Sequence, residues 1–147
     1  MRTAPLGVFD RITRVALAFE KEADALCAGR GVSFWAFGVL STLRRAGAPY
    51  QLTPTELYRT GMITSGGMTK RLIALEGDGL IDRAPADDDR RSVHVRLTRK
   101  GRRLVDALMP DYLALQVSLL ADLNGRERDE LAALLRRLLI AIEEGEA

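Results

Sequence analysis

The sequence is poor in the side chains that build metal sites and hydrolytic active sites. Its 147 residues include one cysteine, Cys27, and one histidine, His94. A single cysteine cannot form a disulfide within the chain, and one histidine leaves little with which to build a zinc site or a Ser/His/Asp arrangement. We therefore expect no metal site, no cofactor and no enzymatic activity.

Long apolar runs are also missing. No stretch approaches the roughly 18 residues that a membrane-spanning helix needs, and the first residues do not resemble a signal peptide. These features predict a cytoplasmic protein that makes no membrane contact. With 47% hydrophobic and 29% charged residues, a chain of this length suits one domain with a single sizeable core.

The net charge of +2 is unevenly distributed along the chain. Between Arg59 and Arg103, eleven Lys and Arg residues stand against six Asp and Glu, whereas eleven stand against fourteen in the rest of the sequence. The middle third is therefore basic and both flanks are acidic. Such a distribution is typical of a segment that faces phosphates.

Helical periodicity marks the first part of the chain. Apolar side chains recur every three or four positions over residues 6–28, which predicts a helix with one apolar stripe. The near-heptad spacing suits packing against another helix, from the same chain or from a second copy. Ser33 can cap a second helix that runs from Phe34 to about Ala46.

The last part of the chain predicts two more helices. Thr98 can cap a long helix that reaches about Leu123 and is bent by Pro110. Asn124 and Glu127 then have the spacing of a capping box at the start of the final helix, which carries a broad apolar face.

Between these parts lies the outline of a helix-turn-helix. Thr53 and Glu56 form a capping box at the start of a short helix, which Gly61 ends. A second helical pattern begins near Thr64 or Ser65 and continues to Gly79. Two short helices joined by a turn that contains glycine predict a helix-turn-helix.

A change of periodicity follows this motif. Residues 80–84 and 93–97 have the pattern of two short strands, the second alternating between apolar and polar side chains. The segment between them, 85–91, is too polar for a core and predicts an exposed hairpin tip. The fold class predicted is therefore mostly α with a small β-wing, as in a winged helix-turn-helix.

The second helix of the motif is rich in groups that can reach phosphates and base edges. Gly66 and Gly67 cost about 1 kcal/mol each in a helix relative to alanine. Either the backbone approaches DNA closely there, or the helix begins loosely or packs tightly on its neighbour. The DNA contacts predicted in this region are Thr64, Ser65, Gly66, Gly67, Thr69, Lys70 and Arg71.

The hairpin tip offers a second set of contacts. Arg90 and Arg91 can enter a minor groove, whose negative potential attracts guanidinium groups. Asp89 can hold an arginine in one orientation through a paired hydrogen bond. The alternative is a solvated turn with charges of both signs.

Two further features have alternative interpretations. Cys27 is either a peroxide-sensing thiol or, on an apolar stripe where burial raises its pKa, an inert one. Phe34, Trp35 and Phe37 are either core residues or the lining of a ligand pocket.

Several strings together resemble the MarR family of bacterial transcriptional regulators. They are LTPTEL, the segment Thr69-Lys70-Arg71, LEGDGLIDR and DRRSVHVRLTRKG, all within residues 52–101, and the order of helices over the whole chain is also similar. The resemblance implies a homodimer in which residues 1–31 and 105–147 form a helical dimerisation region. It also implies that residues 32–104 form a winged helix-turn-helix that binds an inverted repeat of double-stranded DNA.

The resemblance further implies repression that a small anionic or aromatic ligand relieves, bound between the two regions. The helix from Ser65 to about Asp78 would be the recognition helix, and Arg91 the minor-groove contact. The sequence is also similar to the urate-responsive branch of this family. That branch has an acidic ligand-binding residue where this chain has Gly38, and this difference argues against urate itself as the ligand. The ligand-binding residues implied are Phe34, Trp35 and Gly38.

We therefore predict a ligand-responsive, DNA-binding transcriptional repressor that acts as a homodimer. Two alternatives remain open. One is a redox-sensing repressor that uses Cys27, although the peroxide-sensing branch has its cysteine early in the first helix. The other is a winged helix that binds an acidic protein partner.

Overall fold

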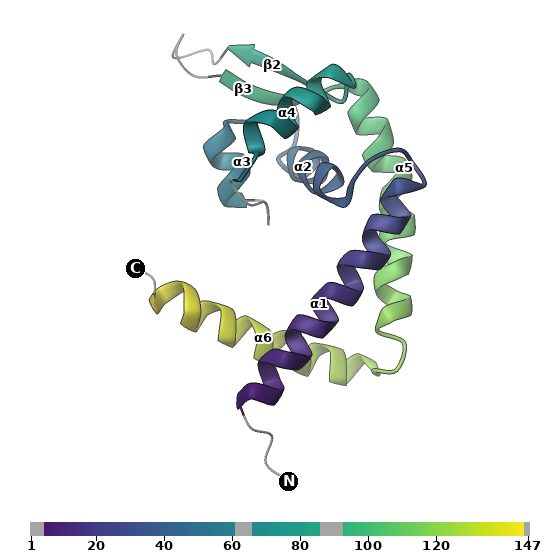
Figure 1. The fold of residues 1–147 in the computed structure, drawn as a ribbon, viewed down its shortest axis with the longest axis vertical. Helices are drawn as coiled ribbons and strands as arrows, with labels where there is room; N and C mark the ends of the chain where they lie inside the picture. The colour runs from purple at the N-terminus through teal and green to yellow at the C-terminus, as the bar shows by residue number, and fades with distance from the viewer. Residues whose placement is uncertain (1–4, 61–65, 86–92, 146–147) are drawn as a thin grey trace. The chain divides into compact units, whose positions relative to one another are not determined.

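The computed structural model describes residues 5–60, 66–85 and 93–145. Within these ranges the chain is mostly helical with one small sheet, which confirms the predicted fold class (Figure 1). The elements in chain order are α1 (Pro5–Ala28), α2 (Phe34–Arg45), β1 (Gln51–Leu52), α3 (Pro54–Thr60), α4 (Met68–Gly77), β2 (Ile81–Pro85), β3 (Val93–Leu97), α5 (Arg99–Leu119) and α6 (Gly125–Gly145).

The chain divides into two compact units, residues 1–112 and 113–147, and their boundary falls inside α5. The first unit holds the elements from α1 to β3 and the start of α5. The second holds the end of α5 and all of α6. The predicted division into a dimerisation region and a DNA-binding region concerns roles, and it stays a prediction.

Local capping signals explain where several helices begin. The Ser33 hydroxyl accepts a hydrogen bond from the Ala36 amide at 3.0 Å, as expected for the N-cap of α2. At α6, the Glu127 amide donates to Asn124 Oδ1 at 3.0 Å and the Asn124 amide donates to Glu127 Oε2 at 2.8 Å. Both predicted helix starts are therefore confirmed.

The sheet is antiparallel with the strand order β1-β3-β2. The β2–β3 hairpin was predicted, and its tip lies outside the described residues. The third strand, β1, was not: Gln51 and Leu52 pair with Arg96 and Val95 of β3. Two residues are too few to show an alternating pattern, so only the pairing with β3 reveals this strand.

The second helix of the motif begins later than predicted. It starts at Met68 instead of Thr64 or Ser65, because Gly67 precedes it in a left-handed conformation with φ 71°. Glycine adopts this conformation without steric cost. Gly66 and Gly67 therefore lie before the helix, and the penalty expected for glycines inside it does not arise. The helix ends at Gly77, short of the predicted Gly79, and α5 likewise ends at Leu119 before the predicted Leu123.

The core of the first unit joins α2, α3, α4, the sheet and α5. Its fully buried side chains include Phe37, Leu40, Leu57, Ile81 and Val95. The element α5 approaches the end of α4 so closely that a Cβ on Gly101 would collide with the Leu80 carbonyl oxygen. A glycine is therefore required where α5 passes Leu80, just before β2, which explains in physical terms the glycine that ends the string DRRSVHVRLTRKG.

Large apolar side chains are exposed along α1, α6 and the second half of α5. In α1 the buried residues among positions 5–28 are Ala23 and Cys27, near its end, while Leu6 and Phe9 are exposed. In α6, over residues 125–145, no residue is buried. The exposed members of the predicted apolar face of α6 are Leu131, Leu134, Leu135, Leu139 and Ile142.

Candidate nucleic-acid interface

The first helix of the motif, α3, is fixed by the predicted capping box. The Thr53 amide donates to Glu56 Oε2 at 2.8 Å, and the Glu56 amide donates to Thr53 Oγ1 at 3.1 Å. Leu57 is fully buried and anchors α3 to the core. Tyr58, next along the helix, is 47% exposed, so α3 presents a polar side to the solvent.

The second helix, α4, packs on the core through one face. Met68, Leu72 and Leu75 are buried, and they recur at the spacing of a helical stripe. Thr69 and Lys70 are exposed. Because its N-cap is a glycine, no N-cap side chain occupies the first amide groups of α4. The exposed start of α4 can therefore offer both side chains and amides to an anionic partner.

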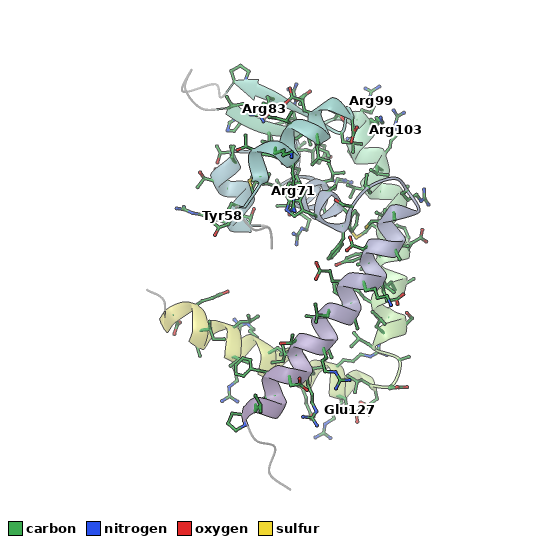
Figure 2. The ribbon with its side chains drawn as sticks, viewed as in Figure 1. Tyr58, Arg71, Arg83, Arg99, Arg103 and Glu127 are labelled. Atoms are coloured by element: carbon green, nitrogen blue, oxygen red, sulfur yellow. The ribbon has the colours of Figure 1, made fainter. Side chains whose placement is uncertain are left out.

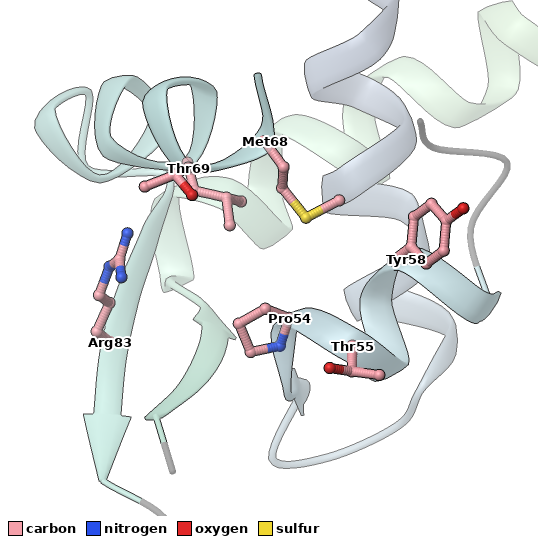
Figure 3. Close-up of a pocket in the computed structure, with 7 residues that line it drawn as sticks. Pro54, Thr55, Tyr58, Met68, Thr69 and Arg83 are labelled. Atoms are coloured by element: carbon pink, nitrogen blue, oxygen red, sulfur yellow. The ribbon is translucent and has the colours of Figure 1, made fainter. Parts of the chain in front are cut away.

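An open cavity of about 330 Å³ lies between α3, α4 and β2. Figure 3 shows Thr55 and Tyr58 on α3 and Thr69 on α4 around it, with Arg83 reaching in from β2. Sequence reasoning missed Thr55, Tyr58 and Arg83. The positions of Thr55 and Tyr58, one helical turn apart on the side away from Leu57, were a usable signal for the first two.

Ion pairs stiffen the wing next to this cavity. Arg83 Nε lies 2.9 Å from Glu76 Oε2 and ties β2 to α4. Arg96 donates to both carboxylate oxygens of Asp82, at 2.9 and 3.1 Å, and so ties β3 to β2. This hydrogen bonding, with the charge of Asp82, raises the pKa of Arg96.

Some cations of the basic middle third make no ion pair with any described residue. They are exposed and include Lys70 on α4. Arg99 and Arg103, at the start of α5, also belong to this set (Figure 2). Lys100, in contrast, donates a hydrogen bond to the carbonyl oxygen of Asp78, the C-cap of α4, at 2.8 Å. Unpaired surface cations are the groups that phosphates attract.

The predicted DNA contacts do not share one environment. Gly66, Thr69 and Lys70 are exposed at the start of α4, next to Gly67. Arg71 is exposed as well, but its guanidinium lies 5.0 Å from the centre of the Trp35 ring in α2. Figure 2 places Arg71 on the side of α4 that faces α2. The remaining predicted contacts lie outside the described residues, namely Thr64, Ser65, Asp89, Arg90 and Arg91.

A second cavity, of about 1120 Å³, lies within the first unit between α1, α2, α4 and α5. The three predicted ligand residues, Phe34, Trp35 and Gly38, all line it. Its wall includes an aromatic cluster in which the ring of Tyr112 lies 6.0 Å from Phe19 and 6.1 Å from Phe34.

The polar lining of this cavity carries both signs. Arg45 and Arg71 are the cations, and Glu20, Asp24 and Asp78 are the carboxylates. Asp24 already accepts a hydrogen bond from the Phe34 amide, at 3.1 Å.

Two buried polar atoms of the cavity lining have no hydrogen-bond partner among the described residues. They are Trp35 Nε1 and Ser41 Oγ. Gly38, in contrast, faces open space, because a Cβ built there would meet nothing within 4 Å. Crowding therefore does not explain why this chain has glycine where the urate-responsive branch has an acidic residue.

Comparison with known proteins decides the family. Residues 30–92 match the MarR family. The transcriptional regulator PecS from Dickeya dadantii is 33% identical over 134 residues, which cover 91% of this chain and 81% of PecS. This chain belongs to the MarR family. The transcriptional repressor MprA from Escherichia coli is also similar, at 28% identity over 80% of this chain and 66% of MprA.

Solved structures of MarR proteins share the fold. Sco3205, a MarR-family regulator from Streptomyces coelicolor in complex with DNA, superposes with a TM-score of 0.84 at 21% identity, over 97% of this chain and 94% of Sco3205. BpsR from Bordetella bronchiseptica has a TM-score of 0.80 at 24% identity, over 89% of this chain and 91% of BpsR. The MarR-family chain is thus a DNA-binding transcriptional regulator with a winged helix, and not an enzyme.

The surroundings of Cys27 do not favour the redox alternative in this MarR-family chain. Cys27 is fully buried, and burial, with a smaller effect from the charge of Asp24, raises the pKa of its thiol to about 11. A thiol with so high a pKa is a poor nucleophile at neutral pH. In the part of the chain that the structure describes, no three His, Cys, Asp or Glu side chains gather as metal ligands, and no helix is apolar over a membrane-spanning length.

Proposed function

We propose that this MarR-family regulator is a ligand-responsive repressor that binds an inverted-repeat operator as a homodimer. The observation that carries the proposal is the exposed start of α4, where Thr69 and Lys70 face the solvent while the opposite side of the helix is buried. A helix packed on the core through one face can enter a major groove with the other, and the adjacent hairpin would contact the minor groove. The relative MprA is named a transcriptional repressor, which supports the same role here.

The proposed DNA contacts combine described and undescribed residues. Gly66, Gly67, Thr69 and Lys70 would meet the major groove together with Thr64 and Ser65, and Arg90 and Arg91, oriented by Asp89, would meet the minor groove. Thr55, Tyr58 and Arg83 join them, because they line the open cavity beside Thr69. Arg71 is treated separately below.

A second copy of the chain is the partner that the exposed apolar faces fit best. The side chains of α6 and of the first half of α1 recur at helical spacing and are exposed, which costs free energy in water. We assign residues 1–31 and 105–147 to dimerisation and 32–104 to DNA binding. Two recognition helices held about 34 Å apart can engage successive major grooves of a palindrome.

The larger cavity is the proposed ligand site. Phe34 and Trp35 give it aromatic walls, and the open space at Gly38 leaves room for a planar molecule. The solved structure of BpsR is described with a mechanism for regulation of its DNA binding by 6-hydroxynicotinic acid, an aromatic acid. A ligand that binds better to a dimer with the wrong helix spacing would release DNA in proportion to its differential affinity.

Selection of bound duplexes from random DNA tests the proposal. We expect a palindromic motif with half-sites about one turn apart. Replacing Lys70 by alanine should weaken binding to the selected duplex and reduce the slope of log affinity against log salt by about 0.9 for each subunit, or about 1.8 for the dimer. Lys21→Ala removes an exposed cation of α1 that lies off its apolar stripe and outside the proposed DNA contacts, so it is the control and should change neither quantity. Recovery of no enriched sequence would contradict the proposal and favour an acidic protein partner instead.

A further inference from the structure

Arg71 stands on the opposite side of the recognition helix, α4, from Thr69, one of the residues proposed to read DNA. Successive residues of an α-helix are rotated by about 100°, so Thr69 and Ile73, each two positions from Arg71, lie on the far side of α4. The residues of α4 that line the larger cavity are Arg71, Ala74 and Leu75, and Asp78, the C-cap of this helix, continues the same stripe. The recognition helix therefore has one side toward the solvent and another toward the cavity.

The guanidinium of Arg71 is held on the cavity side by Trp35. The distance of 5.0 Å from the guanidinium carbon to the ring centre is that of a cation–π contact. Trp35 belongs to α2, whereas Arg71 belongs to α4, so this contact joins the core helix to the recognition helix. In addition, Trp35 Nε1 has no hydrogen-bond partner among the described residues, so no hydrogen bond there competes with Arg71 in fixing the ring.

We propose that the Arg71–Trp35 contact is a latch that holds the recognition helix in its DNA-binding position and that a ligand in the cavity opens it. The proposal rests on the ligand-responsive function proposed above. It makes Arg71 a positioning residue and not a DNA contact. An aromatic occupant that stacks on the face of Trp35 covered by Arg71 competes with the guanidinium for that face and so displaces it.

The displacement reaches DNA because Arg71 is part of α4. The residue follows Thr69 and Lys70 by one helical turn or less, so a shift at Arg71 moves the groups proposed to enter the groove. A contact of this kind at a partly exposed site is worth about a two- to fivefold change in an equilibrium between a latched and a released arrangement. That factor sets the size of the effect to be measured.

Trp35 is the single tryptophan of the chain, so its fluorescence reports on the latch directly. In the free protein, Arg71→Ala should uncover one face of the ring and increase quenching of its emission by acrylamide. Lys70→Ala, the neighbouring cation with no such contact, should leave quenching unchanged. Equal quenching in the wild type and in Arg71→Ala would overturn the latch whether or not the protein binds DNA.

Affinity for the duplex selected from random DNA provides the second test. Arg71→Ala and Trp35→Leu should each lower affinity about two- to fivefold with the salt slope of the wild type, and the double variant should be no weaker than either single one. Lys70→Ala should instead reduce the slope. A reduced slope for Arg71→Ala, or additive losses in the double variant, would overturn the proposal and return Arg71 to the phosphate contacts.

Arg71→Lys and Trp35→Phe guard against a general loss of folding. Both keep a cation or an aromatic face, so they should fall between the wild type and the severe variants in quenching and in affinity. Failure of the wild type to bind any duplex would contradict the proposed function alone, since the quenching comparison still decides whether the latch exists.

Discussion

The helices α2 and α6 are both amphipathic, but they use their apolar faces in opposite ways. Seven residues of α2 are buried, among them Phe37 and Leu40, because α3, α4, the sheet and α5 surround it. No residue of α6 is buried over its described length of 125–145, although its leucines recur at the same spacing. The apolar face of α2 is thus covered by other elements of the chain, whereas the apolar face of α6 stays exposed over residues 125–145.

This contrast separates two sources of stability. The winged-helix core can close on its own, and it is the part that must present α4 rigidly. The exposed faces of α6 and of the first half of α1 contribute to stability only when another surface covers them. We infer that packing within one chain holds α4 in place, whereas association with a second copy is needed to set two such helices at a fixed spacing.

The largest effect on stability is expected from a cavity created in the winged-helix core, which contains Phe37. Phe37 is 1% exposed and its ring lies 5.1 Å from that of Tyr112, so Phe37→Ala should lower the free energy of unfolding by about 3–5 kcal/mol. The matched change in the open region, Leu134→Ala at 59% exposure, should cost less than about 0.5 kcal/mol in dilute protein. Urea unfolding at two protein concentrations measures both. Equal losses would abolish the distinction between the regions.

A smaller but specific effect is expected from charges placed on the open face. Leu134→Glu combined with Leu139→Glu should yield a folded monomer by sedimentation, because the second copy could no longer bury that face. Affinity for a palindromic duplex should fall by about a hundredfold, since the two half-sites would bind independently. Arg137→Glu, away from the leucine face of α6, is the control. A variant that stays dimeric would place the interface elsewhere.

The smallest effect is expected at Cys27, near the buried C-terminal end of α1. Because its thiol pKa is raised to about 11 from an ordinary value near 9, roughly a hundredfold less thiolate forms at neutral pH than for a free cysteine. Reaction with a thiol reagent should therefore accelerate with pH up to about 11, and peroxide should not change DNA affinity. Peroxide sensitivity that disappears in Cys27→Ser would restore the redox alternative.

The same pKa has a consequence for stability. The folded state favours the neutral thiol, so its contribution to stability is complete below pH 9 and is lost as the pH rises toward 11, where the unfolded chain ionises first. Comparing unfolding of the wild type and Cys27→Ser over this pH range isolates the contribution.

Local signals in the sequence were sufficient for most elements. Capping boxes at Thr53 and Asn124 and the cap at Ser33 placed three helix starts, because the groups that satisfy the first amides lie within three residues of one another. The alternation over Val93–Leu97 likewise placed a strand. These interactions are nearly independent of what the rest of the chain does.

Features that join distant residues were decided only by tertiary structure. The pairing of Gln51 with Arg96, the approach of α5 at Gly101 to Leu80 and the position of the Arg71 guanidinium on Trp35 each join residues from different elements. By sequence, Arg71 is one more cation beside Lys70. Its surroundings differ from those of Lys70 because a helix turns successive side chains by about 100°, so packing one face against the core places neighbouring residues in different environments.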